Sequence, residues 1–464
     1  MIYKKKKSEI KFLSILQSFI KKVIFSIGLV FSAFLVSLVI YYFSSGLNKM
    51  YSPSNLVMQI NDKILKRYAG FDLRKSLDYL KIINLNIINS FTSNQLENVY
   101  LEINQQSILG LELQRKARSE NGGELTDEQK IFHPATLKFN NENYRIKLRT
   151  KGTRSIHWKK KDETSYKIDI RGQKRIWGME EFSLQKPVTR NYTYEYLFHK
   201  LLGHVGLLKI QYFFINLYLN DQNLGVYAVE ESFSKELVER QGKRNGPIFG
   251  LNEEDGIEYP NVFYDIYSEK YWKENNPKLV KNAFAKLNLI KRNEIDLNDL
   301  FDLEKWAKFF AVIDFSNALH GSLSKSVKLF YNPASGKFEP IGFDGHYFEN
   351  NIANDFIILD FLNPNNKSKC NHICYDRNWY LKFLKKSDGS VNEKFINLYL
   401  EELKKISSEI FLVSFKEKYL DEIKFYNSQF LSETSNKDRS LYKGLGYFIF
   451  DKDYLENRKN YIQK

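Results

Sequence analysis

The sequence predicts an α+β protein in which one transmembrane helix precedes a β-rich part and then an α-rich part. Three observations support this prediction. An uncharged run of 21 residues covers 23–43, strand-like alternation fills 135–171, and amphipathic helical patterns dominate beyond Trp379. The chain has 464 residues, of which 43% are hydrophobic, so it can bury a large core. This composition excludes disordered and collagen-like proteins.

Residues 23–43 are long enough to cross a membrane as a helix, because each helical residue adds about 1.5 Å and a hydrocarbon core measures about 30 Å. A cleavable signal peptide is the alternative. Its apolar region usually ends in small residues, whereas this run ends in Tyr41-Tyr42-Phe43. Residues 1–22 hold seven lysines and one acid, which predicts a basic cytoplasmic tail. We therefore expect a single-pass membrane protein whose main domain is extracytoplasmic.

The net charge of +15 is unevenly distributed, since residues 1–22 alone carry +6 and the rest +9. A body this mildly basic gives little reason to expect a nucleic-acid partner. The two cysteines, Cys370 and Cys374, are too few for a disulfide scaffold or a four-cysteine zinc site. His372 between them adds a third metal ligand without a fourth. A surface loop with an incidental or disulfide-bonded pair is the preferred interpretation.

The expected elements divide the remaining chain into three parts. For residues 44–95 we expect a juxtamembrane connector with some helix. Residues 96–231 predict a mostly antiparallel sheet with an inserted helix, because strand-like alternation recurs between turn residues. Residues 232–464 predict an α-rich part that begins with a short helix and a polar stretch to about residue 294. The expected strands are 98–104, those within 135–171, 210–220 and 225–230, and the expected helices include 107–118 and 191–202.

Asp314 interrupts an apolar stripe on a predicted helix that Asp302 caps. A carboxylate in such a stripe must be paired, capped or functional. The structural alternative is a charge at the end of the helix. The sequence lacks the motifs of P-loop nucleotide hydrolases, Rossmann oxidoreductases, zincin proteases and serine hydrolases.

Asp344 follows an apolar strand of a predicted hairpin whose turn covers residues 332–337. If the same number of residues is counted along each strand away from this turn, Asp344 lies opposite Lys325 and Ser326. A carboxylate at the open end of a hairpin can hold a cation. The structural alternative is a simple turn, since Asp-Gly pairs are common in turns.

Several short segments follow one another along the chain in a characteristic order. They are Arg149-Thr150-Lys151-Gly152, Ser165-Tyr166-Lys167-Ile168, Phe182 to Pro187 with Arg190, Asn220 to Glu231, Tyr331-Asn332-Pro333, Glu339-Pro340-Ile341 and Asp344-Gly345. Over roughly residues 95–460, this order resembles the CotH family of atypical, protein-kinase-like enzymes. The resemblance implies a two-lobed kinase-like domain with a β-rich N-lobe and an α-rich C-lobe. It also implies transfer of phosphate from ATP, with Mg²⁺ or Mn²⁺, to serines of a secreted protein.

Phosphoryl transfer needs a lysine on the nucleotide phosphates and an acid that orients this lysine. By position within the resemblance, Lys167 is the expected phosphate lysine and Lys151 the second candidate. Glu195, on the following helix, is expected to pair with Lys167. Glu230 and Glu231 end a strand where the nucleotide base would lie. The structural alternative for each residue is an exposed side chain in a salt bridge.

Phosphoryl transfer also needs side chains that bind the metal ion and a base that accepts the proton of the acceptor hydroxyl. Asp344 resembles the metal-binding aspartate that precedes a glycine. The kinase-like pattern also has an aspartate and then an asparagine before the hairpin. Here His320 occupies the position of the aspartate as the expected base, and Ser326 that of the asparagine as a metal contact. Asp314 is the nearest carboxylate upstream and the further catalytic candidate.

Three functions compete at this point. The first is a membrane-anchored extracytoplasmic kinase that phosphorylates a surface or secreted protein. The second is a catalytically inactive kinase-fold protein that serves binding or assembly in the cell envelope. The third is a transferase that uses another donor to modify a surface polymer.

Overall fold

The structure is a computed structural model. It describes residues 95–251, 264–292, 294–345, 356–363 and 376–433, together with residues 456, 459 and 460. All of these belong to one of the two compact units of the chain. Among them, no helix combines the length and apolar character that a membrane span requires. The predicted basic tail, the transmembrane helix, nearly all of the connector and the pair Cys370 and Cys374 lie outside the described residues.

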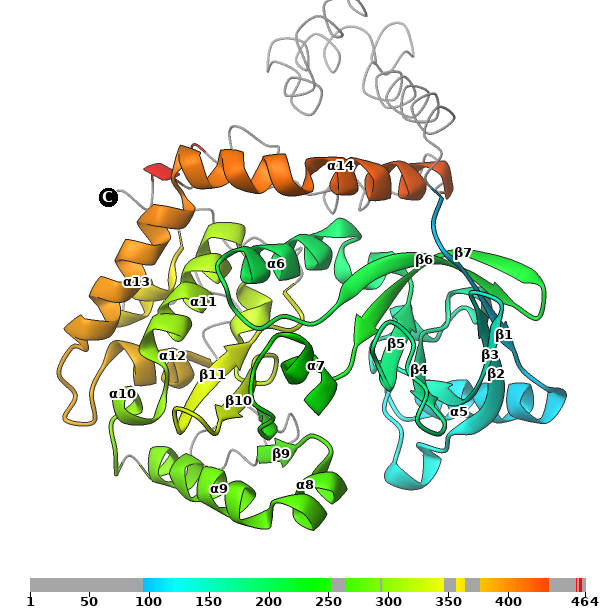
Figure 1. Cartoon of the computed structure of the whole chain (residues 1–464), viewed down its shortest axis with the longest axis horizontal. Coiled ribbons are helices and arrows are strands. Elements are labelled where there is room, and N and C mark those ends of the chain that lie inside the picture. The colour runs from blue at the N-terminus through cyan, green and yellow to red at the C-terminus, as the bar shows by residue number, and fades with distance from the viewer. Residues whose placement is uncertain are drawn as a thin grey trace, which may run out of the picture. The chain divides into compact units, whose positions relative to one another are not determined.

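The β-rich part is a closed barrel of seven strands in the order β1-β2-β3-β4-β5-β7-β6 (Figure 1). All neighbouring strands are antiparallel except β1 and β6, whose parallel pairing closes the barrel. Alternate side chains such as Ile146, Leu148 and Ile168 fill its interior, as the two-residue period of a strand requires. The strands are Asn98–Glu102 (β1), His133–Phe139 (β2), Glu142–Thr150 (β3), Tyr166–Ile170 (β4), Glu181–Gln185 (β5), Tyr212–Leu219 (β6) and Gln222–Glu231 (β7).

Two tight turns of the barrel have the conformation that their sequences favour. Asn140 and Asn141 join β2 to β3 with φ values of 49° and 61°. Asn220 and Asp221 join β6 to β7 with φ values of 45° and 66°. Asn and Asp tolerate this left-handed region better than other residues with a side chain, and such turns match the twist of a hairpin. The predicted hairpins at both places are confirmed.

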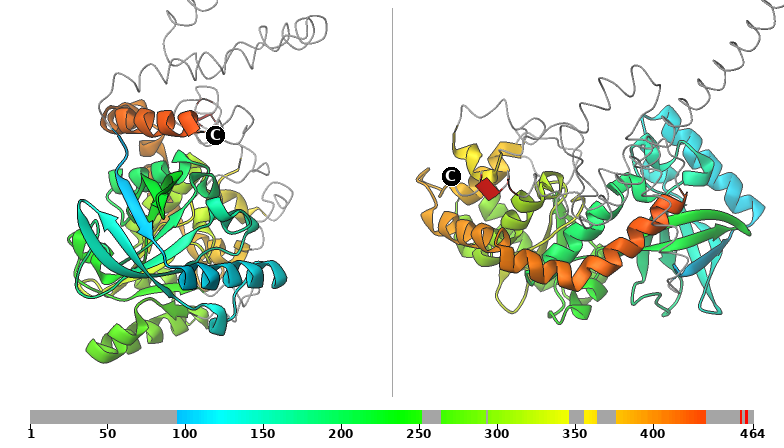
Figure 2. Two further views of the ribbon diagram at one scale, coloured as in Figure 1. Left: turned by 90° about the vertical axis from the view of Figure 1, so that its right-hand side faces the viewer. Right: turned by 90° about the horizontal axis from the view of Figure 1, so that it is seen from above.

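Three helices pack against the barrel. Helix α5 (Gln105–Glu120) lies against β2, where Ser107 Oγ donates to the carbonyl of Pro134 at 2.8 Å (Figure 2). Helix α6 (Thr193–His204) follows β5, and helix α14 (Glu409–Glu433) crosses β6. The rings of Tyr426 and Phe430 on α14 each lie 4.8 Å from Phe214 on β6, edge to face. Tyr196 on α6 contacts the rings of both Phe214 and Tyr426, so α6 and α14 are joined to one another and to the barrel.

A second, antiparallel sheet has the order β11-β10-β8-β9. Asn332 pairs with Lys337, so the predicted register of the β10–β11 hairpin is confirmed. The stretch up to about residue 294, which the sequence identifies only as polar, contains two strands and two helices in its described part. Helix α9 buries Ala283, Leu287 and Ile290, one apolar stripe that its many lysines obscure in the sequence. The elements are Ile248–Leu251 (β8), Tyr264–Ile266 (β9), Glu269–Asn275 (α8), Pro277–Lys291 (α9), Lys328–Asn332 (β10) and Lys337–Ile341 (β11).

Except for the short helix Lys235–Arg240, the remaining helices surround an aromatic core centred on Trp306, whose ring lies 4.8 Å from Phe383. The predicted cap of α11 is confirmed, because Asp302 Oδ1 accepts from the Lys305 backbone N–H at 3.3 Å. The predicted α+β class is also confirmed. These helices are Lys235–Arg240 (α7), Leu297–Leu300 (α10), Leu303–Ser316 (α11), Arg377–Leu384 (α12) and Glu393–Ile406 (α13).

Candidate functional site

A pocket of about 640 Å³ is lined by residues from the barrel and from the second sheet. This volume is typical of small-molecule sites. Six carboxylates balance most of the cationic charge of its walls, so the pocket presents paired ions rather than a uniformly basic surface. The cations that line it are Arg118, Lys130, Arg149, Lys151, Lys167, Lys325 and Lys328.

Glu230 is the acid in the wall of this pocket with the most cationic surroundings. Its side chain is 3% exposed and accepts from Lys151 Nζ and, at 2.9 Å, from Gln185 Nε2. Burial by itself would raise the pKa of Glu230, but Lys151 and Arg190 outweigh burial and the pKa is lowered. Glu230 is therefore a buried, ionised carboxylate that holds Lys151 at the pocket.

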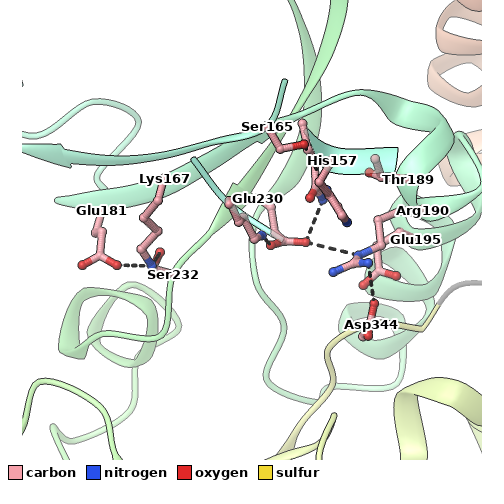
Figure 3. Close-up of polar contacts among 12 residues, drawn as sticks. His157, Ser165, Lys167, Glu181, Thr189, Arg190, Glu195, Glu230, Ser232 and Asp344 are labelled. Atoms are coloured by element: carbon pink, nitrogen blue, oxygen red, sulfur yellow. Dashed lines mark hydrogen bonds and ion pairs between the residues drawn. The ribbon is translucent and has the colours of Figure 1, made fainter. Parts of the chain in front are cut away.

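Arg190 connects this pair to Asp344. It ends a short 3-10 helix, Pro187–Arg190, that follows β5. Arg190 Nε lies 3.6 Å from Glu230 Oε2, and Nη1 lies 2.8 Å from Asp344 Oδ1. Figure 3 shows Glu230, Arg190 and Asp344 in one line of ion pairs. A carboxylate of the barrel and a carboxylate that follows the second sheet thus share one buried guanidinium.

Asp344 lies three residues beyond β11, in a left-handed conformation with φ of 62°. His320 approaches it from the preceding loop, with Nδ1 2.9 Å from the Asp344 carbonyl and 3.1 Å from Oδ2. The two backbones also pack closely. A Cβ on Gly321 would lie only 2.9 Å from the Cα of Gly345, so this contact requires glycine. As predicted from the hairpin register, Asp344 lines the same pocket as Lys325 and Ser326.

Helix α12 supports the loop that carries His320 and Ser326. Asp376, just before α12, accepts from the Ser324 backbone N–H at 2.5 Å and from Ser324 Oγ at 2.9 Å. Burial raises the pKa of Asp376, although both of these hydrogen bonds oppose that effect. From the first turns of α12, Trp379 Nε1 donates to the carbonyl of Ser322 at 3.1 Å. The loop is thereby fixed to the start of α12.

The predicted pairing of Lys167 with Glu195 is wrong. Lys167 Nζ donates to Ser232 Oγ at 2.8 Å and forms an ion pair with Glu181. Glu181 lies on β5, which pairs with β4, and Ser232 directly follows β7, the next strand of the barrel. Glu195 is fully buried on α6, where its Oε1 lies 3.0 Å from His199 Nε2. Helix α6 brings Glu195 close to Arg190 instead of Lys167.

Glu231 and Asp314, two further residues that the sequence predicted in the site, are held by contacts with other parts of the protein. Glu231 lines the pocket, yet both of its oxygens accept from Arg240, at 2.7 and 2.6 Å. Asp314 is fully buried, and its Oδ2 accepts from the Ile358 backbone N–H at 3.0 Å and from Tyr399 O–H at 2.5 Å. Asp314 does not belong to the pocket lining. The geometry therefore gives Asp314 the role of joining α11 to α13 and to the segment at Ile358.

Arg190, Glu230 and Asp376 are central to this arrangement. The sequence predicted Glu230 near the nucleotide base and not as the partner of a phosphate lysine, and it assigned no site role to Arg190 or Asp376. Arg190 and Glu230 stand in the segments that carry the family resemblance, which is the one available signal. Asp376 has no motif around it. Its partner Ser324 lies 52 residues away, so only the folded chain reveals the contact.

The described residues contain no cluster of three or more His, Cys, Asp or Glu side chains suited to a metal ion. A magnesium site on a nucleotide does not require such a cluster, because one or two carboxylates together with substrate phosphates and water are usual. Asp344, with the buried Ser326 hydroxyl in the same pocket, matches that donor set. The residues present therefore fit a cation that a bound triphosphate completes.

Comparison with protein families agrees with this geometry. The family model described as CotH kinase protein matches residues 148–463, which is more than half of the chain. The matched range contains Lys151, Lys167, Glu230, Arg190 and Asp344. A comparison with curated proteins found no match. The extent of the family match shows that the chain belongs to the CotH kinase family.

Proposed function

We propose that this protein is a membrane-anchored, extracytoplasmic kinase with two kinase-like lobes that transfers the γ-phosphate of ATP to a surface or envelope protein. The observation that carries the proposal is the line of ion pairs from Lys151 through Glu230 and Arg190 to Asp344, in a pocket of suitable size. Membership of the CotH kinase family supports ATP-dependent phosphoryl transfer as the reaction that these ion-paired residues serve.

Lys151 and Lys167 supply positive charge for the nucleotide phosphates. Lys151 is the better positioned of the two, because its partner Glu230 is buried and ionised. Its side chain is 19% exposed and lines the pocket, so Glu230 orients the ammonium in the pocket wall. Such a lysine–glutamate pair orients a phosphate-binding lysine in kinases. Lys167 has the more exposed partner Glu181, and it adds charge at the neighbouring strand.

Asp344 would hold Mg²⁺ or Mn²⁺ together with the phosphates, with the Ser326 hydroxyl as an additional oxygen nearby. When bound, the cation neutralises charge on the transferred group. Asp344 also positions His320. A carbonyl oxygen only accepts hydrogen bonds, so His320 Nδ1 carries the proton that it donates to the Asp344 carbonyl at 2.9 Å.

This tautomer makes His320 Nε2 the nitrogen that can accept a proton. In the proposed reaction, Nε2 takes the proton of the acceptor hydroxyl while the hydroxyl oxygen bonds to the γ-phosphorus. The bond between the γ-phosphorus and the bridging oxygen breaks, and ADP leaves with that oxygen. His320 is thus the proposed base at the position where the family pattern has an aspartate.

One observation favours a second function, a binding or assembly protein of the envelope without catalysis. His320 and Ser326 replace the expected aspartate and asparagine, and Arg190 already neutralises Asp344. Such a protein would bind nucleotide in the same pocket and transfer nothing.

Incubation of the detergent-solubilised full-length protein with γ-labelled ATP, Mg²⁺ and a serine-rich acceptor protein separates the two functions. The kinase proposal predicts label on the acceptor. His320→Ala should reduce this label while nucleotide affinity stays near that of the wild type, because the base acts on the acceptor. Nucleotide binding without label under these conditions would favour the binding protein.

A further inference from the structure

The cation that the proposed reaction requires must compete for Asp344 with a side chain of the protein. Arg190 Nη1 lies 2.8 Å from Asp344 Oδ1, which is the distance of a charge-assisted hydrogen bond. A divalent ion and a guanidinium repel each other strongly at such separations. Binding of the ion to Asp344 therefore requires Arg190 to leave this carboxylate.

Arg190 cannot simply turn into water. The residue is 7% exposed, and its guanidinium lies 5.6 Å from the centre of the Phe343 ring. A buried charge without a partner is costly, so Arg190 needs another carboxylate inside the protein. Glu230 is already engaged by Lys151 and Gln185, and its distance of 3.6 Å from Arg190 Nε exceeds that of a hydrogen bond.

Glu195 provides the second partner. Its Oε1 contacts His199, whereas its fully buried Oε2 has no hydrogen-bond partner among the described residues. Figure 3 shows Glu195 beside the guanidinium of Arg190. Burial by itself would lower the pKa of Arg190, but Asp344, Glu230 and Glu195 together raise it. The arginine thus lies within the field of a carboxylate that it does not yet contact.

The backbone next to Arg190 is unusual. Asn191 and Tyr192 have φ values of 51° and 58°. Tyr192 combines its positive φ with ψ of −113°, a region that side chains disfavour. A strained backbone conformation therefore lies two residues from the arginine that has to move.

We propose that Arg190 regulates cation binding by exchanging partners. It neutralises Asp344 in the nucleotide-free protein and turns to Glu195 when a divalent cation binds Asp344. The identity of the cation rests on the proposed function. The exchange itself concerns the protein without nucleotide, so it can be tested apart from catalysis.

The test measures Mn²⁺ binding to the solubilised full-length protein without nucleotide, by electron paramagnetic resonance of the free ion. Arg190→Gln removes the competing charge, so Mn²⁺ affinity should rise roughly 5- to 150-fold, the usual range for coupled sites. Mn²⁺ should also raise the melting temperature of this variant more than that of the wild type, since the ion replaces the lost counter-charge.

Arg175→Gln is the matched control. Arg175 also lies between two carboxylates, Glu180 at 2.9 Å and Glu236 at 3.4 Å, but neither of these carboxylates lines the pocket, whereas Asp344 does. Its loss should leave Mn²⁺ affinity at the wild-type value. An equal rise in both variants would reflect net charge alone and would overturn the proposal.

Glu195→Gln tests the second partner with the opposite sign. Arg190 then lacks an alternative to Asp344, so Mn²⁺ affinity should fall below that of the wild type. In the Arg190→Gln background, Glu195→Gln should have little effect on Mn²⁺ affinity, because no arginine is left to move between Asp344 and Glu195. An unchanged or lower Mn²⁺ affinity in Arg190→Gln, or an equal Glu195→Gln effect in both backgrounds, would overturn the exchange. Absence of phosphoryl transfer would contradict only the proposed function.

Discussion

Lys151 and Lys167, the two candidates for the phosphate lysine, have different partners, and this difference predicts which of them contributes more to nucleotide binding. Lys151 contacts the buried Glu230, whereas Lys167 contacts Ser232 and the more exposed Glu181. We expect Lys151→Met to weaken binding of an ATP analogue by roughly 10- to 100-fold, equivalent to about 1.5–3 kcal/mol for a hydrogen bond to a charged group. Lys167→Met should cost less. Isothermal titration of both variants checks this order, and a larger loss in Lys167→Met would contradict it.

His157 predicts a specific pH dependence of stability. It is 4% exposed, and burial lowers its pKa to about 3, with Arg190 and Lys151 acting in the same direction. Between pH 6.5 and 3 the unfolded chain binds a proton that the folded protein excludes, so acid favours unfolding. This residue should therefore cost about 1.4 kcal/mol of unfolding free energy per pH unit below 6.5.

His157→Gln removes this contribution and should flatten the pH profile. Urea unfolding of wild type and variant at pH 7, 6 and 5 provides the measurement. Parallel profiles for the two proteins would show that His157 binds its proton equally well in the folded and unfolded states, and would contradict this prediction.

Counting along one hairpin predicted the neighbours of Asp344, because antiparallel pairing links residues by a fixed sum of their numbers. The contacts of Arg190 could not be predicted in this way. Its partner Asp344 lies beyond a barrel, several helices and a second sheet, and no local period connects the two positions. The sequence predicted the wrong partner for Lys167 for the same reason, because the choice between Glu181 and Glu195 depends on how the strands pair.

At the scale of elements, α12 determines where the His320 loop lies. Asp376 accepts two hydrogen bonds from Ser324, at 2.5 and 2.9 Å. Asp376→Ala should reduce phosphoryl transfer and leave nucleotide affinity nearly unchanged, because the loop positions the base and not the nucleotide. The expected loss is on the order of 1–3 kcal/mol in transition-state stabilisation.

Asp388→Ala is the control for this prediction. Asp388 also accepts from both the backbone N–H and the hydroxyl of one serine, Ser390, at 2.9 and 2.6 Å, but on an exposed turn. Steady-state rates and nucleotide affinities of the two variants should separate them. Equal rates of phosphoryl transfer in Asp376→Ala and Asp388→Ala would contradict the prediction that α12 positions the His320 loop.

Elements with a strong period were predictable, and elements that depend on distant pairing were not. The barrel hairpins followed from alternation and from turn residues such as Asn220. The closure of the barrel did not, because the parallel pairing of β1 with β6 joins segments more than a hundred residues apart. Strands β8 and β9 are short and pair only in the context of β10. Their sequences carry no alternation long enough to recognise.

At the scale of the whole molecule, the anchor of residues 23–43 remains a prediction from the sequence. The protein should fractionate with membranes and resist extraction by carbonate, because a span of 21 uncharged residues inserts stably. Protease added outside intact cells should digest the domain after residue 46. Recovery of a soluble chain that begins near residue 46 would identify the segment as a cleaved signal peptide.

The central claim is that Asp344 holds the cation that accompanies the nucleotide. Isothermal titration of an ATP analogue, with and without Mg²⁺, on wild type and Asp344→Asn tests this claim most directly. The ratio of the two affinities within each protein cancels any general effect of losing the partner of Arg190. The wild type should bind the analogue more tightly with Mg²⁺ than without it, and Asp344→Asn should bind it equally in both conditions. The same Mg²⁺ dependence in both proteins would contradict the assignment of Asp344.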